Sequence, residues 1–248
     1  MMTECAFIIG DVHGCLKQLE QLLTYWNPDS EKLFFIGDLI DRGENSRGVV
    51  QLAMKLRKEY GAVVIGGNHE EMFLEWLDAP INHATYYYPR GGKATISSFL
   101  GEERFHSLSH TDLSKALQHF FPEEITFLES LPDYVEHEGY LFVHAGIDPR
   151  RKDWRDTEKM FFRSIREPFY TKENKSGKMI IFGHTPTRRI HPNKKDDIWI
   201  SPCKTKIDID GGAVFGGMLH GLHLKENGEY QLHSITSNLE VRDHTFLL

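Results

Sequence analysis

Three short apolar runs in this chain are each followed at once by glycine and then by polar side chains. The runs cover residues 6–9, 33–36 and 62–65, and the segments after them are Gly-Asp-Val-His-Gly (10–14), Gly-Asp-Leu-Ile-Asp-Arg-Gly (37–43) and Gly-Gly-Asn-His-Glu (66–70). An apolar run of four residues is typical of a buried β-strand, and a glycine at its end is typical of a turn. One such segment would be a weak signal. Three in succession predict that polar side chains gather at one edge of a sheet.

Segments with helical spacing separate these predicted strands. Apolar residues recur at helical spacing between positions 16 and 26, and again between positions 46 and 60. Strands that alternate with helices predict parallel strands joined by right-handed crossovers. Ligands of such sheets bind beyond the carboxyl ends of the strands. All three glycine-led segments fall at that edge, so we expect the functional site there.

The alternation of strands and helices is lost between residues 79 and 132. Residues 93–100 begin like a helix and residues 112–121 have helical spacing, whereas the Tyr-Tyr-Tyr-Pro-Arg-Gly-Gly segment at 86–92 is interpreted as a loop. We therefore expect a helical insertion that lies over the site. It is predicted to belong to a single domain spanning residues 1–248 and not to form a domain of its own.

Strand signals return after the insertion. Glu138-Gly139 predicts the turn of a hairpin between residues 134–137 and 140–144, and residues 179–182 form another apolar run that ends in glycine. From residue 198 onward the pattern is typical of short antiparallel strands. The chain is thus expected to fold as an α/β protein in which two sheets pack together with helices outside.

At these residues the chain resembles a known family. The segments 10–14, 37–43 and 66–70 look like the three signature blocks of metallophosphoesterases of the phosphoprotein phosphatase type, a calcineurin-like group. Val-His-Ala-Gly at 143–146 and Gly-His-Thr-Pro at 183–186 continue the resemblance, which covers most of the chain. It is nearest to small bacterial serine/threonine protein phosphatases and symmetrical diadenosine-tetraphosphate hydrolases. The resemblance implies a four-layer αββα sandwich of two mixed sheets flanked by helices.

The resemblance also implies a centre that binds two divalent metal ions. The candidate ligands are Asp11, His13, Asp38, Asn68, His144 and His184. Asp11 and His13 would hold the first ion, and the second would be held by Asn68, His144 and His184, with Asp38 bridging the two. Carboxylates, an amide and imidazoles without any thiolate favour Mn²⁺, with Fe or Zn²⁺ as alternatives, over a structural zinc cage.

Matching the same blocks residue by residue assigns three further roles. His69 is the candidate general acid, because an imidazole can donate a proton near neutral pH. Asp41 would orient His69. Arg42 would bind phosphate oxygens, which a planar guanidinium matches with two hydrogen bonds.

Two more arginines are candidates for phosphate binding. Ser-Ile-Arg-Glu at 164–167 resembles a Trp-Ile-Arg-Asp segment of the family and selects Arg166, although serine in place of tryptophan leaves Arg163 open. Arg90 lies in a segment that resembles a family loop near the substrate, where it would either contact phosphate or lie on the surface. The tyrosines at 86–88 would pack within the insertion or stack on a nucleobase or a substrate side chain.

The function implied by the resemblance is hydrolysis of phosphoserine and phosphothreonine monoesters by direct attack of a hydroxide held between the two metals. The alternative is symmetrical hydrolysis of diadenosine tetraphosphate, and a distant one is a non-catalytic metal-binding scaffold. The typical bacterial form of that hydrolase often carries glutamine where His13 stands, which favours the phosphatase.

The composition limits which partners the protein can bind and in which compartment it is expected. A net charge of −7 provides no overall basic field for binding nucleic acid, so we expect a phosphoprotein or a phosphorylated small molecule as substrate. No signal-peptide pattern or apolar segment of membrane-spanning length is found, so a cytoplasmic protein without membrane contact is expected. The three scattered cysteines argue against a disulfide framework.

Overall fold

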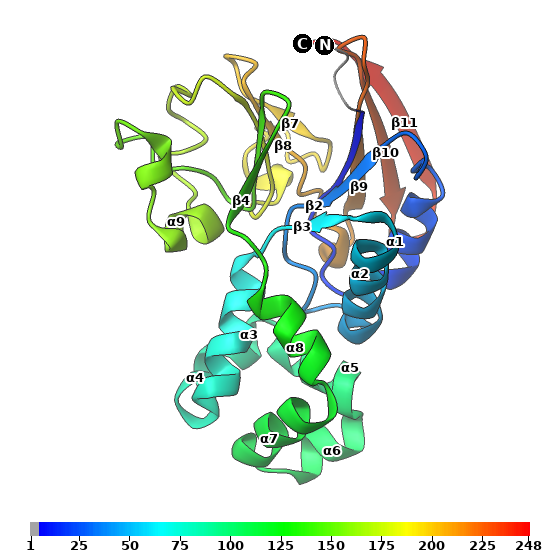
Figure 1. Cartoon of the computed structure of the whole chain (residues 1–248), viewed down its shortest axis with the longest axis vertical. Helices are drawn as coiled ribbons and strands as arrows, with labels where there is room; N and C mark the ends of the chain where they lie inside the picture. Colours follow the sequence, from blue (N-terminus) through cyan, green and yellow to red (C-terminus); the bar gives the residue numbers. More distant parts are fainter. Residues whose placement is uncertain (1–4) are drawn as a thin grey trace.

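Two mixed β-sheets lie in the upper part of the molecule, as oriented in Figure 1, in the computed structural model, which describes residues 5–248. The first sheet has the strand order β11-β10-β9-β1-β2-β3. Its strands are β1 (Ala6–Ile9), β2 (Lys32–Phe35), β3 (Val63–Val64), β9 (Met218–Leu224), β10 (Tyr230–Thr236) and β11 (Val241–Phe246). β1, β2 and β3 pair in parallel, which confirms the prediction from the three apolar runs. β9, β10 and β11 extend the sheet with antiparallel pairs.

The second sheet has the strand order β4-β5-β6-β8-β7. Its strands are β4 (Tyr134–His137), β5 (Tyr140–Val143), β6 (Met179–Phe182), β7 (Trp199–Ile200) and β8 (Lys206–Asp208). β4 and β5 form the predicted hairpin. The expectation of antiparallel strands from residue 198 onward is confirmed between β7 and β8 but is wrong on the other side of β8, which pairs in parallel with β6. After β6 the chain returns through residues 183–205, so β8 starts at the same end of the sheet as β6.

The core between the two sheets consists of side chains that alternate along the strands. Ile8 of β1 packs in the same cluster as Phe34 of β2 and Phe142 of β5, and all three are fully buried. Phe7 and Ile9 point to the other face of the first sheet, where they join the cluster that includes helix side chains. Successive side chains of a strand face opposite sides. Burial of both faces therefore explains why β1 is apolar at every position.

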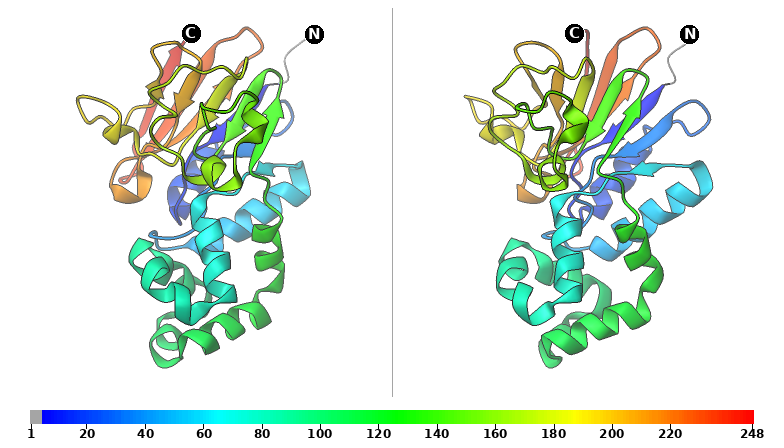
Figure 2. Two further views of the ribbon diagram at one scale, coloured as in Figure 1. Left: turned by 90° about the vertical axis from the view of Figure 1, so that its left-hand side faces the viewer. Right: turned by 60° about the vertical axis from the view of Figure 1, so that its left-hand side comes forward.

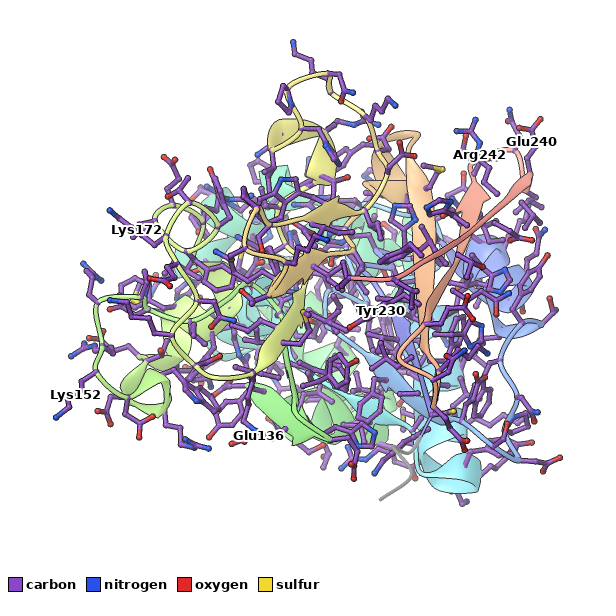
Figure 3. All side chains as sticks on the ribbon, turned by 90° about the horizontal axis from the view of Figure 1, so that it is seen from above. Glu136, Lys152, Lys172, Tyr230, Glu240 and Arg242 are labelled. Carbon is purple, nitrogen blue, oxygen red and sulfur yellow. The ribbon has the colours of Figure 1, made fainter. Side chains whose placement is uncertain are left out.

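Polar contacts also join the two sheets at the end far from the site. The hydroxyl oxygens of Tyr140 on β5 and Tyr230 on β10 lie 3.1 Å apart. Figure 3 shows Tyr230 near the middle of the molecule, whereas Glu240, just before β11, and Arg242, on β11, lie at its outer margin.

Helices cover the outer faces of the sheets. α1 (Leu16–Leu23) and α2 (Ser46–Tyr60) pack on the first sheet, and α9 (Lys159–Ser164) contributes to the cluster on the outer face of the second (Figure 1). α2 begins where the Asn45 side chain accepts a hydrogen bond from the backbone N–H of Gly48 and ends at Gly61, whose φ is 69°. None of the helices in residues 5–248 combines the length and apolarity needed to cross a membrane.

The segment between α3 (Asn68–Asp78) and β4 is helical, and Figure 2 shows it extending away from the sheets as a separate group of helices. Its helices are α4 (Pro80–Tyr87), α5 (Gly92–Leu100), α6 (Glu102–Ser107), α7 (His110–Phe120) and α8 (Pro122–Glu129). The predicted loop at residues 86–92 is wrong, because α4 runs to Tyr87 and continues as a 3₁₀ turn to Arg90. Burial of Tyr87 holds the helix together until Gly91, whose φ is 111°. The single-domain organisation stays a prediction.

Candidate metal centre and active site

The polar segments after five strands meet at one edge of the two sheets. Residues 11–13 follow β1, residues 38–42 follow β2, and residues 68–70 open α3 just beyond β3. His144 follows β5 and His184 follows β6. All three parallel strands of the first sheet end here, as do β5 and β6 of the second, so the predicted convergence at the carboxyl edge is found.

Two groups of side chains at this edge could each hold a metal ion, and they share one carboxylate. The first consists of His13, Asp38 and His69, and the second of Asp38, His144 and His184. Within each group the potential ligand atoms lie within 4.8 Å of one another. Asp38 Oδ2 is 3.4 Å from His13 Nε2, and Asp38 Oδ1 is 3.3 Å from His144 Nε2. Burial alone would raise the pKa of Asp38, but His144 and His69 beside it hold that pKa well below its usual range.

The two histidines next to Asp38 are held in the ring form that a metal ligand requires. His13 Nδ1 donates to the carbonyl oxygen of Ile40 at 2.7 Å, and His144 Nδ1 donates to that of Ile36 at 2.8 Å. Nε2 is therefore the atom of each ring that would bind a metal, through its lone pair in the neutral ring. Metal-bound histidines characteristically donate their other ring N–H to a carbonyl or carboxylate in this way. The donors fit a metal centre.

The remaining predicted ligands, Asp11 and Asn68, lie beside the second group. Asn68 Oδ1 is 3.2 Å from His144 Nε2. The Asp11 carboxylate accepts from the backbone N–H of His184, with its oxygens 3.1 and 3.3 Å from that nitrogen, and Asp11 is in neither of the two groups found among the described residues. The structure thus brings all six candidate ligands to one edge.

Buried carboxylates are concentrated around Asp11. Burial raises the pKa of Asp11 well above its usual range, and the charges of Asp210 and Asp38 raise it further. Burial also raises the pKa of Asp210 to about 6 and that of Asp208 well above its usual range. Asp208 Oδ2 is buried and has no hydrogen-bond partner in the described part of the chain. Buried carboxylates without cationic partners are unfavourable. A site with this much unpaired negative charge suits divalent cations.

Several site residues have an uncommon backbone conformation. His13, Asp38, Asp41, Arg42 and His184 have φ angles of 45°, 51°, 71°, 71° and 67°. Left-handed φ values are rare outside glycine and cost about 1–3 kcal/mol each for strained positions, so they persist where surrounding structure enforces them. Their concentration here means that the loops are shaped to aim side chains into the site.

The glycines that end the strands are needed for the carboxylates to fit. A Cβ atom at Gly67 would collide with Asp38 Oδ1, and one at Gly183 would collide with Asp11 Oδ1. The backbone of one loop therefore lies directly against the acidic side chain of another. This close approach explains why glycine stands between a strand and its polar residues.

His69 and Asp41 form a buried hydrogen-bonded pair. His69 Nδ1 lies 2.6 Å from Asp41 Oδ2. The other Asp41 oxygen accepts from the Tyr87 hydroxyl at 2.7 Å and from the Thr95 hydroxyl at 2.6 Å. Sequence reasoning missed Tyr87 and Thr95, because they come from α4 and α5 of the insertion and no local pattern marks them. The insertion thus contributes directly to the site.

Arg42 lies beside the first metal group. Its guanidinium Nη1 donates to His13 Nε2, and the guanidinium carbon is 5.1 Å from the centre of the Phe215 ring. The guanidinium is therefore held between a candidate ligand and an aromatic ring.

Arg166, and not Arg163, faces the ligand set. Arg166 Nη1 donates to the hydroxyl of Thr185, the residue after His184, at 2.8 Å. Burial lowers the pKa of Arg166. Arg163 is buried against the backbone of Gly66 and donates to Asp133 at 2.7 Å. The geometry favours the Arg166 alternative of the sequence analysis.

In the described part of the chain, the Arg90 side chain contacts Tyr86 and none of the candidate metal ligands. It is exposed, donates to the carbonyl oxygen of Tyr86 at 2.8 Å, and has its guanidinium carbon 3.7 Å from the centre of the Tyr86 ring. The carbonyl of the next residue, Gly91, accepts from the backbone N–H of Arg42 at 3.2 Å. The segment is therefore next to the site through its backbone.

Glu70 is a site residue to which sequence reasoning gave no role. Its buried carboxylate accepts from the backbone N–H groups of Asp38 at 3.0 Å, Leu39 at 2.8 Å and Gly67 at 2.8 Å. Burial raises the pKa of Glu70, and the charge of Asp38 adds to that effect. Its third place in α3, after the glycine that precedes the helix, is the capping-box position that could have indicated it. Glu70 ties the loop after β2 to the loop after β3.

A model of the calcineurin-like phosphoesterase family matches residues 7–203. The chain belongs to this family. The match confirms the resemblance drawn from the five sequence blocks. The asymmetrical bis(5′-nucleosyl)-tetraphosphatase PrpE of Oceanobacillus iheyensis is 29% identical over 245 residues, which cover 88% of each chain. PrpE of Bacillus cereus strain Q1 is 28% identical over 247 residues, covering 88% of this chain and 90% of the relative.

Solved structures share the fold. A protein proposed to be a diadenosine tetraphosphatase superimposes with a TM-score of 0.62 at 21% identity, over 98% of this chain and 94% of that one. A cold-active protein-tyrosine phosphatase of a Shewanella species superimposes with a TM-score of 0.57 at 16% identity, over 97% of this chain and 80% of that one. At these identities the likeness establishes the calcineurin-like phosphoesterase fold alone.

The contacts of Glu70 predict an effect on metal binding in this phosphoesterase. Glu70→Gln turns one acceptor oxygen into an amide that faces backbone N–H groups, so the loop bearing Asp38 loosens. We expect metal affinity, measured by calorimetry, to fall about 10–100-fold, as for other residues that hold a ligand in place. The neighbouring Glu71→Gln is the matched control, because Glu71 only approaches Lys159 at 3.9 Å. Equal metal affinity in the two variants would contradict the role.

Proposed function

We propose that the chain is a two-metal phosphohydrolase that cleaves a dinucleoside tetraphosphate asymmetrically, to a nucleoside triphosphate and a nucleoside monophosphate. The observation that carries the hydrolytic part is the Asp38 carboxylate shared by two potential metal groups, next to the His69–Asp41 pair. The substrate is supported by the PrpE relatives, which are named asymmetrical bis(5′-nucleosyl)-tetraphosphatases and match this chain over nearly its whole length. Their name also favours asymmetrical cleavage over the symmetrical reaction of the sequence analysis.

Six side chains would hold the metals in this proposal. They are Asp11, His13, Asp38, Asn68, His144 and His184. Oxygen and nitrogen donors without sulfur suit Mn²⁺, Fe or Zn²⁺. Two such ions would acidify a water molecule and neutralise charge on the reacting phosphate.

His69 would give a proton to the leaving oxygen. With Nδ1–H donated to Asp41 at 2.6 Å, the His69 ring is fixed in orientation and its Nε2 atom is the one that can carry the transferred proton. Tyr87 and Thr95 hold the other Asp41 oxygen, so the pair cannot easily turn. A leaving polyphosphate is a much weaker base than the alkoxide of serine or threonine. Its departure therefore depends less on this proton.

Arg42 and Arg166 would bind the non-bridging oxygens of the substrate. Arg42 contacts His13 of the first metal group, and Arg166 binds Thr185, which follows His184 of the second. The two guanidinium groups thus approach the ligand set from its two halves. Planar guanidinium groups match phosphate oxygens with paired hydrogen bonds.

Hydrolysis of phosphoserine and phosphothreonine in proteins is the second candidate. It is favoured by His13, because the typical bacterial form of the symmetrical diadenosine-tetraphosphate hydrolase often carries glutamine at this position. The same ligands, arginines and general acid would serve both reactions. A non-catalytic scaffold is disfavoured, because all six candidate ligand residues are present in the chain and His69 is hydrogen-bonded to Asp41.

The experiment that tests the proposal compares substrates side by side. The protein is stripped with a chelator, reloaded with Mn²⁺, and given diadenosine tetraphosphate or a phosphothreonine peptide at equal concentration. We expect faster cleavage of the dinucleotide, with ATP and AMP as products in a chromatographic assay. Production of ADP alone would contradict asymmetrical cleavage. Faster release of phosphate from the peptide would replace the proposal by the second candidate.

His69→Asn tests whether this histidine donates a proton or binds metal, since it also belongs to the first potential metal group. We expect two metals per chain to be retained and kcat for the dinucleotide to fall about 10²-fold, at the lower end of the usual effect of a general acid. Metal content is measured by mass spectrometry beside the rate. The exposed His106→Asn is the control. If metal and activity were lost together, His69 would be a ligand.

A further inference from the structure

A cavity of about 900 Å³ opens beside Arg42. It lies between the start of α1, the loop after β2, the 3₁₀ turn η4 (Ala213–Phe215) and the turn between β10 and β11. We call it the α1 cavity. Its volume is within the range of pockets that bind small molecules. Arg42 lines this cavity and also contacts the candidate ligand His13, so the cavity adjoins the metal centre.

An exposed aromatic ring lies beside Arg42, on the residue between Val214 and Gly216, which both line the cavity although the ring itself does not. Phe215 at the end of η4 is 50% exposed, which is unusual for a phenylalanine, and its ring centre is 5.1 Å from the Arg42 guanidinium carbon. An exposed aromatic ring beside a phosphate-binding cation is the arrangement by which proteins stack nucleic-acid bases while holding the phosphates. Phe215 is therefore placed to contact the group attached to a phosphate on Arg42.

An unpaired donor lies in the wall of the same cavity. Gln18 of α1 lines the α1 cavity and is only 8% exposed. Its Nε2 atom is buried and has no hydrogen-bond partner among residues 5–248. Buried donors are nearly always paired, so this N–H would gain a partner if the Gln18 side chain turned toward an acceptor in the cavity. This observation is independent of Phe215.

The charges around the α1 cavity suit an uncharged occupant. Lys17 and Arg42 supply positive charge, and Glu20 and Glu44 supply negative charge. These charges balance, so the cavity has no excess of positive charge for a run of phosphates. An uncharged group with hydrogen-bond acceptors fits better, with its phosphate at Arg42.

We propose that the α1 cavity binds one nucleoside of the substrate, with its base stacked on Phe215 and an acceptor of the nucleoside taking the N–H of Gln18. This inference rests on the proposed function, because it names the group carried by the phosphate in the same site. It also fits asymmetrical cleavage, in which the reacting phosphate can be the one that carries the nucleoside. The nucleoside site is then next to the metals.

The test replaces the stacking ring. The ratio of kcat/KM for diadenosine tetraphosphate to that for inorganic tripolyphosphate is measured for the Mn²⁺-loaded protein and for Phe215→Ala. We expect this ratio to fall about tenfold, because base stacking contributes on that order. A disturbance of Arg42 would lower both rates and leave the ratio unchanged. Phe215→Tyr keeps an aromatic ring, so its ratio should stay at the wild-type value. Gln18→Leu should lower the ratio several-fold. It should not lower Tm, because replacing Gln18 by leucine removes a buried donor that has no partner.

Phe120→Ala is the matched control. Phe120 on α7 is 55% exposed, and its ring centre is 5.4 Å from the guanidinium carbon of Arg104. The variant thus removes another exposed phenylalanine that lies beside an arginine, but from the insertion. We expect the substrate ratio to stay at the wild-type value.

Binding of AMP separates this inference from the proposed function. We expect AMP to bind the wild-type protein about tenfold more tightly than it binds Phe215→Ala, measured by calorimetry. If the dinucleotide were not cleaved but this difference in AMP affinity were found, the nucleoside site would stand and the proposed function would fall. If the dinucleotide were cleaved while Phe215→Ala changed neither the substrate ratio nor the AMP affinity, the function would stand and the nucleoside site would be wrong.

Discussion

The carboxylate of Asp38 is the group on which the rest of the site depends. Its two oxygens face His13 on one side and His144 on the other, so one side chain joins the segments that follow β1, β2 and β5. Its backbone is held in the left-handed region, and Glu70 accepts its N–H. The two sheets must pack with their carboxyl edges together for these contacts to exist. The apolar core between the sheets therefore holds the charged and polar groups of the site in place.

Much of this arrangement could be predicted from the sequence because it is determined by residues that are neighbours in the chain. An apolar run followed by glycine and a polar residue specifies a strand, a tight turn and the direction of a side chain within a few residues. That pattern located Asp11, Asp38 and Asn68, and the parallel pairing of β1, β2 and β3 brought their segments to one edge. His144 and His184 follow buried strands in the same way.

The parts that sequence reasoning missed depend on contacts between distant segments. Tyr87 and Thr95 hold Asp41 across about fifty residues, and no periodicity in α4 or α5 signals such a bond. The direction of β8 depends on where the chain returns to the sheet, which its three residues cannot indicate. Substrate choice also depends on such contacts between distant segments. The hydrolytic groups suit several phosphoesters, so selectivity must lie in surrounding features such as the cavity beside Phe215.

Metal stoichiometry tests most directly the claim that Asp38 joins two metal positions. After chelation, reloading with Mn²⁺ and dialysis, the wild-type protein should retain two ions per chain by mass spectrometry. Asp38→Asn should lose both, because the shared carboxylate is absent, whereas the exposed Asp78→Asn at the end of α3 should retain both. Two ions retained by Asp38→Asn, or a single ion in the wild-type protein, would contradict the account.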